Sequence, residues 1–276
     1  MADRVAELAA AYLRQRGLDP RPGVVPDQIL AGDMELGLTN LRQVGALVAE
    51  SDWPATVQRH FDNVLPGVET GPAADWAGAR PNLRIRIYSV ADVPPAESLV
   101  AWALAEGLLA TLVYDLPNAL FNVAPKVTEP WGQSRDGLWQ AALENMSREK
   151  APQVTAIGEA TTPMVVIEGE SYYTATNVLW LDRLTPVDAT RGAVVAIPSR
   201  HLLIVHPVNV LRVAATVNLM LSAAARMYDH GPGSISDHLY WWRPGRLTLI
   251  PSDRRQNSVT PPDEFVQLLR RLPPAP

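Results

Sequence analysis

The sequence predicts an α+β fold in which helices pack on antiparallel or mixed sheets. Two strand patterns followed by a helix pattern recur near residues 27–65, 108–148 and 193–228, and strands grouped in this way are typical of α+β proteins. The regular alternation of one strand with one helix, which a parallel sheet requires, does not occur. These strand-strand-helix units share no residue-level similarity, so the sequence does not establish a duplication.

The length and composition fit a folded protein of one large domain or two closely packed subdomains. The chain has 276 residues, 47% hydrophobic and 19% charged, which is a globular composition. Residues 67–82 are rich in glycine, alanine and proline and lack periodicity, so they are the best candidate for a connector. We therefore expect an N-terminal subdomain at 1–66 and a main α+β domain at 83–276, although one continuous fold would also fit.

The first third of the chain contains helices on either side of a weak strand pattern. Residues 3–16 place apolar side chains at helical spacing, which predicts an amphipathic helix. Segment 27–40 alternates weakly, as a half-buried strand does. Thr39 and Asn40 are candidate caps for the helix that follows, and a further helix pattern begins after Asp52.

The middle of the chain is richer in strands. Strict alternation at 83–88 and a continuous apolar run at 108–115 predict one half-exposed strand and one buried strand. Ser134 is a suitable N-cap for a helix over 135–148. Further patterns predict strands near 153–158 and 163–168, a helix over 171–184, hairpins over 193–205 and 239–250, and helices over 208–228 and 262–272.

The turn of the 193–205 hairpin carries the first candidate site residues, Ser199, Arg200 and His201. Two buried strands would hold this polar turn rigidly, and a fixed guanidinium can bind a carboxylate or a phosphate through two parallel hydrogen bonds. The alternative interpretation is an exposed turn, or an arginine that bonds neighbouring backbone carbonyls. Asn145, in the helix over 135–148, is a second candidate, because asparagine inside a helix often makes a cap or a buried hydrogen bond.

Asp237, His238 and Trp242 complete the candidate binding residues. Nucleophilic catalysis uses the residue types found at Asp237 and His238 and at the nearby Ser234 and Ser236. Neighbouring positions cannot by themselves supply the geometry of a catalytic triad, although partners could come from distant segments. We expect Asp237 and His238 to lead into a strand and to be mostly solvated. Trp241 and Trp242 must face opposite sides of a strand. An outward-facing tryptophan would suit a binding surface, unless a helix covers it.

No recognisable motif assigns a catalytic residue, a metal site or a cofactor. The chain has no cysteine, which removes disulfides, thiolate metal sites and thiol catalysis and fits a reducing cytoplasm. The five histidines lack the close spacing of zinc sites. A net charge of −5 argues against nucleic acid as a partner. The most apolar stretch, 202–225, is interrupted by polar and charged residues, so we expect no membrane span.

Three short motifs occur in order in the C-terminal half. They are an Ala-x-x-Asn helix segment at Ala142 and Asn145, a small-residue segment after an acidic turn at 169–176, and a Pro-Ser-Arg turn at 198–200. With this order and spacing, the region of roughly 108–250 resembles the YtpQ-like bacterial proteins of unknown function. The resemblance implies a cytosolic bacterial protein and implies no particular reaction.

These observations lead to two functional hypotheses. The first is a non-enzymatic cytoplasmic binding or regulatory protein that contacts another protein, or a second copy of itself, through an aromatic and arginine-rich surface. The second is a small-molecule-binding protein or a hydrolase-like enzyme whose site lies around the turn at 198–201. The sequence identifies neither the partner nor the ligand.

Overall fold

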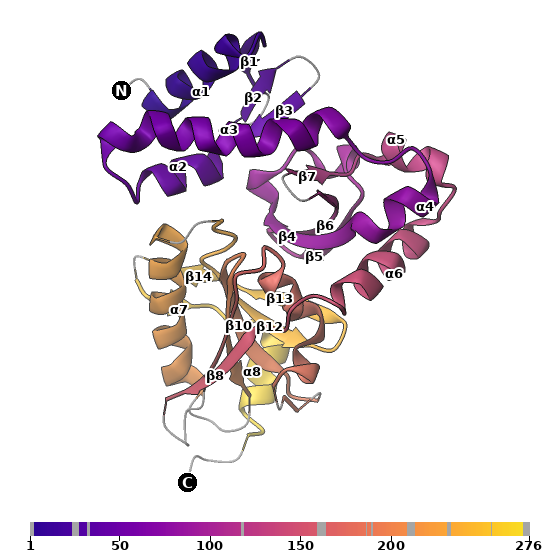
Figure 1. Cartoon of the computed structure of the whole chain (residues 1–276). Coiled ribbons are helices and arrows are strands. Elements are labelled where there is room, and N and C mark those ends of the chain that lie inside the picture. Colours follow the sequence, from indigo (N-terminus) through magenta and orange to yellow (C-terminus); the bar gives the residue numbers. More distant parts are fainter. Residues whose placement is uncertain are drawn as a thin grey trace. The chain divides into compact units, whose positions relative to one another are not determined.

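The structure is a computed structural model that describes most of the chain (Figure 1). The described residues are 3–23, 28–31, 34–116, 119–158, 164–185, 187–188, 190–208, 213–230, 233–254 and 256–272. Helices and antiparallel sheets occur together in them, which confirms the predicted α+β class.

The chain forms two compact units whose segments are interleaved along the sequence. The first unit consists of Met1–Ile85, Ala91–Ala101 and Thr111–Arg148. The second consists of Arg86–Val90, Trp102–Ala110 and Glu149–Pro276. The chain therefore passes between the units several times.

The first unit contains most of the helices. They are α1 (Arg4–Gln15), α2 (Thr39–Gly45), α3 (Trp53–Thr70), α4 (Trp76–Ala79), α5 (Pro125–Thr128) and α6 (Arg135–Met146). A small antiparallel sheet joins β1 (Pro20–Pro22), β2 (Gln28–Ala31) and β3 (Met34–Gly37) in that order. This sheet and helices α1 and α3 bury one apolar cluster, which includes Leu13, Leu36 and Phe61.

Side chains cap the starts of α1 and α6 in the first unit, whereas no side chain caps α2. The Asp3 carboxylate accepts a hydrogen bond from the Ala6 backbone N–H at 3.2 Å, and the Ser134 hydroxyl accepts one from Gly137 at 3.1 Å, as predicted for α6. The expected cap of α2 is wrong, because Thr39 lies inside the helix and Leu38 precedes it without a side-chain bond.

A second sheet contains residues of both units. Its order is β4-β6-β5, with β7 also paired to β6. The strands are β4 (Leu83–Ser89), β5 (Ala101–Ala105), β6 (Leu108–Leu116) and β7 (Ala119–Asn122). Strand β4 alternates as predicted: Leu83, Ile85 and Ile87 are buried, while Arg84, Arg86 and Tyr88 are only partly buried. The first seven residues of β6 are buried, which confirms the predicted central strand.

The second unit is built on a six-stranded antiparallel sheet of order β13-β12-β10-β11-β9-β8. The strands are β8 (Gln153–Ile157), β9 (Met164–Glu168), β10 (Ala193–Ser199), β11 (Leu202–Pro207), β12 (Leu239–Arg243) and β13 (Arg246–Ile250). The two hairpins predicted from the sequence, β10–β11 and β12–β13, are both confirmed. A short pair, β14 (Ser252–Asp253) and β15 (Ser258–Val259), follows.

Apolar layers cover both faces of this sheet, because neighbouring residues of each strand point to opposite sides. Val195, Ile197 and Trp242 face a 3-10 helix, Thr174–Arg183, which occupies most of the predicted helix at 171–184. Val194 and Trp241 belong to the opposite cluster, which includes residues of α7 (Val213–His230) and α8 (Asp263–Leu269). The remaining short 3-10 helices are Glu50–Asp52, Arg80–Asn82, Val90–Asp92, Ala96–Ser98 and Glu129–Trp131.

The apolar sequence of 208–228 predicts a central helix, and this prediction is wrong: α7 covers one face of the sheet and leaves its other side exposed. Met220, Leu221 and Ala224 are buried against the sheet, whereas Leu219 is 57% exposed and Met227 also faces solvent. An apolar composition therefore overstated the burial of this helix, since part of its apolar surface is left uncovered.

We expect Leu203→Ala to lower the free energy of unfolding by about 2–5 kcal/mol, because this leucine is fully buried on β11 and truncation leaves a cavity. Leu219→Ala is the matched control, with an expected change within about 0.5 kcal/mol because the side chain is exposed. Urea unfolding followed by circular dichroism measures both. Equal losses in the two variants would contradict the described sheet.

Candidate functional site

The turn at 198–201 ends the most deeply buried strand of the second unit. All seven residues of β10 are buried, and the strand pairs with β12 on one side and β11 on the other. The turn itself is also inside the fold: Ser199 is buried and Arg200 is only 7% exposed. The alternative interpretation of these residues as an exposed turn is therefore wrong, and the turn is a fixed element of the core.

The segment at 233–236 lies along this turn. It links two groups of predicted site residues, the turn itself and the pair Asp237 and His238. The Arg200 N–H donates to the Gly233 carbonyl at 2.8 Å, and the Ile235 N–H donates to the Pro198 carbonyl at 3.0 Å. Ser199 and Ser234 form an antiparallel bridge between the same segments. Asp237 and His238 follow directly in the chain, so the structure brings them to the neighbourhood of the turn.

Gly233 fixes the stem of Arg200. Its φ angle of +73° lies in the left-handed region that favours glycine. A Cβ atom at this position would lie 2.6 Å from Cδ and 2.8 Å from Cγ of Arg200, closer than such atoms approach. The absence of a side chain at Gly233 therefore allows the Arg200 stem to pack against the backbone.

Two side chains orient the Arg200 guanidinium. Its Nε–H donates to Nε2 of His201 at 2.9 Å, and its central carbon lies 4.5 Å from the centroid of the Tyr172 ring, a cation–π distance. Nδ1 of His201 lies 3.0 Å from the Gly169 carbonyl oxygen. Because Nε2 accepts a hydrogen bond, Nδ1 must carry the proton and donate to Gly169, so His201 is neutral in this arrangement.

The electrostatics of the turn reflect burial and the gathering of positive charge. Burial and the neighbouring Arg86 lower the pKa of Arg200 to about 10. Burial and the Arg200 charge also lower the pKa of His201, with a smaller contribution from Arg86 in the same direction and opposing backbone hydrogen bonds to Gly169 and Ser171. Groups with strongly perturbed pKa values cluster at functional sites, although structural clusters can show the same effect.

Arg86 of β4 extends the cluster. Its guanidinium carbon lies 4.6 Å from the centroid of the Tyr88 ring, and alternation places both side chains on the same face of the strand. Burial raises the pKa of Tyr88. The Nε atom of Arg86 is buried and has no hydrogen-bond acceptor among the described residues, a situation that costs about 1–3 kcal/mol for a polar group. We call Arg86, Tyr88, Tyr172, Arg200 and His201 the arginine–tyrosine cluster.

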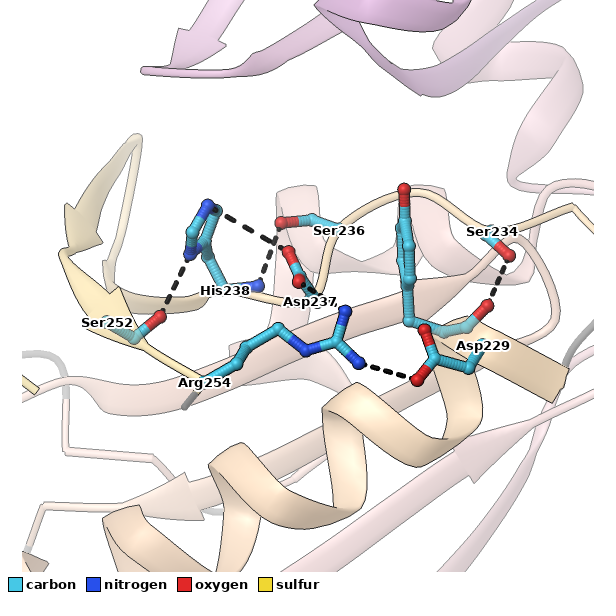
Figure 2. A network of polar contacts seen from close by, with 8 residues as sticks. Asp229, Ser234, Ser236, Asp237, His238, Ser252 and Arg254 are labelled. Atoms are coloured by element: carbon cyan, nitrogen blue, oxygen red, sulfur yellow. Dashed lines mark hydrogen bonds and ion pairs between the residues drawn. The ribbon is translucent and has the colours of Figure 1, made fainter. Parts of the chain in front are cut away.

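The second polar group is an ion-pair network at the end of α7 (Figure 2). One guanidinium nitrogen of Arg254 lies 2.5 Å from an Asp229 carboxylate oxygen and another lies 3.1 Å from an Asp237 oxygen. These pairs raise the pKa of Arg254, chiefly through the hydrogen bond to Asp229. The network connects the end of α7, the segment after Gly233 and the end of β14.

His238 approaches the geometry of a catalytic triad without reaching it. Its Nδ1 lies 2.9 Å from the hydroxyl of Ser252, a residue that no sequence pattern had indicated. Its Nε2 lies 3.9 Å from the nearer Asp237 oxygen, which is beyond hydrogen-bond distance. Asp237 is instead paired with Arg254, as Figure 2 shows. In this geometry, the histidine lacks the carboxylate that would fix its tautomer for proton transfer.

The other serines of this region have structural partners. The Ser236 hydroxyl accepts the His238 backbone N–H at 3.1 Å and lies 2.8 Å from the Tyr240 hydroxyl. Burial raises the pKa of Tyr240 to about 12. The Ser234 hydroxyl donates to the Tyr228 carbonyl at 2.6 Å. These bonds stabilise the loop, and none of them activates a hydroxyl as a nucleophile.

Asn145 belongs to the first unit, whereas the other candidate site residues belong to the second. Its amide nitrogen donates to the carbonyl oxygens of Arg80, at 2.6 Å, and Leu83, at 3.0 Å. The side chain is buried. This confirms the interpretation of Asn145 as a buried hydrogen-bonding residue, and it ties α6 to the start of β4.

Trp242 is not an exposed anchor. It is 3% exposed, and its indole N–H donates to the Val178 carbonyl at 2.7 Å. The 3-10 helix Thr174–Arg183 covers it, so the alternative in which a helix covers this tryptophan is correct. The sequence indicated that Trp241 and Trp242 face opposite sides, but could not show that both sides are covered.

The described residues include no group of three or more His, Asp or Glu side chains that could hold a metal ion. Within the same part of the chain, no helix has the length and apolar character needed to cross a bilayer. Comparison with protein-family models, with curated proteins and with solved structures found no match. The resemblance to the YtpQ-like proteins therefore rests on the sequence motifs alone.

The lowered pKa of His201 predicts a contribution to acid sensitivity. A histidine whose folded pKa lies below its unfolded value of about 6.5 stabilises the folded protein at neutral pH. That contribution to stability is lost as the pH falls below the pKa of the unfolded state and then through the pKa of the folded state. We expect His201→Gln to lose less stability than the wild-type protein at acidic pH, because glutamine takes up no proton and can still accept a hydrogen bond.

Urea unfolding of both proteins at about pH 8 and about pH 5 measures this effect. His60, whose pKa is also lowered by burial, contributes a loss of the same sign to both proteins and cancels in the comparison. Identical pH dependence in the two proteins would show that His201 does not titrate as described.

Proposed function

We propose that this chain is a non-enzymatic binding protein that acts through contact with another protein. The observation that carries the proposal is the arginine–tyrosine cluster, in which Tyr172 is 52% exposed above a buried Arg200. The absence of cysteine and the YtpQ-like motifs support a bacterial, cytoplasmic setting for this role.

The composition of the cluster suits a protein contact. Tyrosine and arginine are enriched among the residues that contribute most to binding energy at protein interfaces. Tyr172 offers aromatic surface at its exposed side, and Arg200 beneath it is already held by His201 and by the Gly233 backbone. A side chain that is ordered before binding loses little conformational freedom on binding, which favours affinity.

The enzymatic alternative receives less support from the geometry. The Ser199 hydroxyl lies 3.4 Å from the His201 backbone N–H and is buried in the hairpin turn. The His201 ring, which would have to act as a base, already accepts the Arg200 Nε–H. A proton acceptor occupied in this way cannot also take a proton from a hydroxyl group, so we assign no catalytic role to Ser199 or His201.

We expect Tyr172→Ala to weaken the contact by about 10- to 30-fold, which corresponds to about 1.5–2 kcal/mol for an aromatic anchor. Affinity capture from cells that contain the protein, followed by identification of the captured partner and titration of the purified pair, measures the effect. Met227→Ala is the matched control, because it truncates an exposed apolar side chain of the same unit, on α7.

Two outcomes would contradict the proposal. One is a stoichiometric partner whose affinity is unchanged by Tyr172→Ala. The other is the recovery of no partner together with a monomeric state in light scattering, since self-association would also count as a protein contact.

A further inference from the structure

We infer that strand β8 pairs with β8 of a second copy of this chain, so that two six-stranded sheets join into one. Strand β8 lies at one end of the sheet order, and β9 is its only neighbour among the described strands. About half of the backbone N–H and C=O groups of an edge strand point away from the sheet. A strand from another molecule can satisfy this row of groups, because its own backbone presents the matching donors and acceptors.

Strand β8 lacks the features that usually prevent an edge strand from pairing. Its five residues, Gln-Val-Thr-Ala-Ile, include no charge and no proline. It pairs with β9 in consecutive residue pairs, without a bulge. Charged side chains, prolines and bulges are the devices by which proteins protect their sheet edges. An edge without them either makes a specific contact or promotes aggregation.

The exposed side chains of β8 indicate that a strand occupies this edge. Val154 and Ile157 are large apolar residues that remain exposed, and alternation places them on opposite faces of the sheet. A helix or loop packed on one face would cover only one of them. A strand added beside β8 reaches both faces through its cross-strand and diagonal neighbours, so it would bury part of each side chain.

The sequence of β8 is compatible with antiparallel pairing to itself. A two-fold axis through Thr155 is the register in which all five residues are paired. Thr155 then lies opposite Thr155 of the second copy, Val154 opposite Ala156, and Gln153 opposite Ile157. Like charges directly opposite each other destabilise a strand pair, whereas threonine pairs stabilise it. This register contains no charge and places two threonines on the axis.

The opposite edge of the sheet explains why the assembly would stop at two copies. Strand β13 begins with Arg246, which is exposed and lies 3.5 Å from Glu264 of α8, so this edge carries charges. Symmetric pairing uses the β8 edge of each copy once and then closes. The joined sheet would have β13 at both of its ends, and we therefore expect a dimer and no longer polymer.

This inference goes beyond the proposed contact at the arginine–tyrosine cluster, because it uses the backbone edge of β8 and none of the side chains of the cluster. Tyr172→Ala, which tests the cluster, should leave the dimer intact. The two contacts are therefore tested separately.

The test is the mass of the full chain in solution, measured by sedimentation velocity and light scattering over a range of micromolar concentrations. We expect twice the monomer mass of 30.1 kDa, with dissociation on dilution. Amide hydrogen exchange should show that protection of β8 rises with protein concentration, because the outward N–H groups become hydrogen-bonded, while protection of β13 stays constant.

A pair of charge variants tests the register. Thr155→Lys and Thr155→Glu each place two like charges opposite each other on the axis, and each should raise the dissociation constant about tenfold or more. An equimolar mixture of the two variants should restore the dimer, because lysine then lies opposite glutamate. This rescue also shows that both variants fold.

Thr248→Lys is the matched control, because it adds the same charge to a partly buried threonine at the centre of the other edge strand, β13. It should change the dissociation constant less than about twofold, since it lies outside the paired edge.

The inference is overturned if the wild-type chain stays monomeric at high micromolar concentration, including the case in which β8 becomes protected only when a different protein is bound. It is also overturned if the dimer withstands Thr155→Lys, or if mixing the two charge variants does not restore it. Equal weakening by Thr248→Lys or Tyr172→Ala would place the contact elsewhere and would overturn it as well.

Discussion

Burial of strand β10 on both faces is the constraint on which the second unit depends. Its residues alternate between two apolar layers, one under the 3-10 helix Thr174–Arg183 and the other under α7 and α8. A strand enclosed in this way cannot shift by one residue without turning each side chain toward the wrong layer. The turn at its end, and with it Arg200, therefore occupies one position.

That position explains the chemistry of the turn. A guanidinium buried to this degree loses hydration, and its neighbours include a neutral imidazole that accepts its Nε–H and a tyrosine ring that lies against it. Carboxylate pairing is used nearby, where Asp229 and Asp237 hold Arg254 at the surface. Arg254 thereby ties the end of α7 to the segment after Gly233.

The sequence was sufficient for features that depend on neighbours in the chain. Alternation predicted the exposed and buried faces of β4, and spacing predicted the cap at Ser134 and the two hairpins. It was insufficient for features that depend on which layer covers a face. Trp242 faces a helix that periodicity cannot locate, and the charge that helps to lower the pKa of Arg200 belongs to Arg86, more than a hundred residues earlier in the chain. Alternation placed Arg86 and Tyr88 on one side of β4, but it could not show which residues that side contacts.

The bridge between Ser199 and Ser234 also bears on how the protein folds. It closes a loop that contains β11 and α7, so the segment that positions Gly233 against Arg200 is joined to its partner only through a long excursion of the chain. Closing such a loop has an entropic cost that local hairpins avoid. The hairpin can form early from local contacts, whereas the packing of Gly233 on the stem of Arg200 is a product of late, long-range assembly.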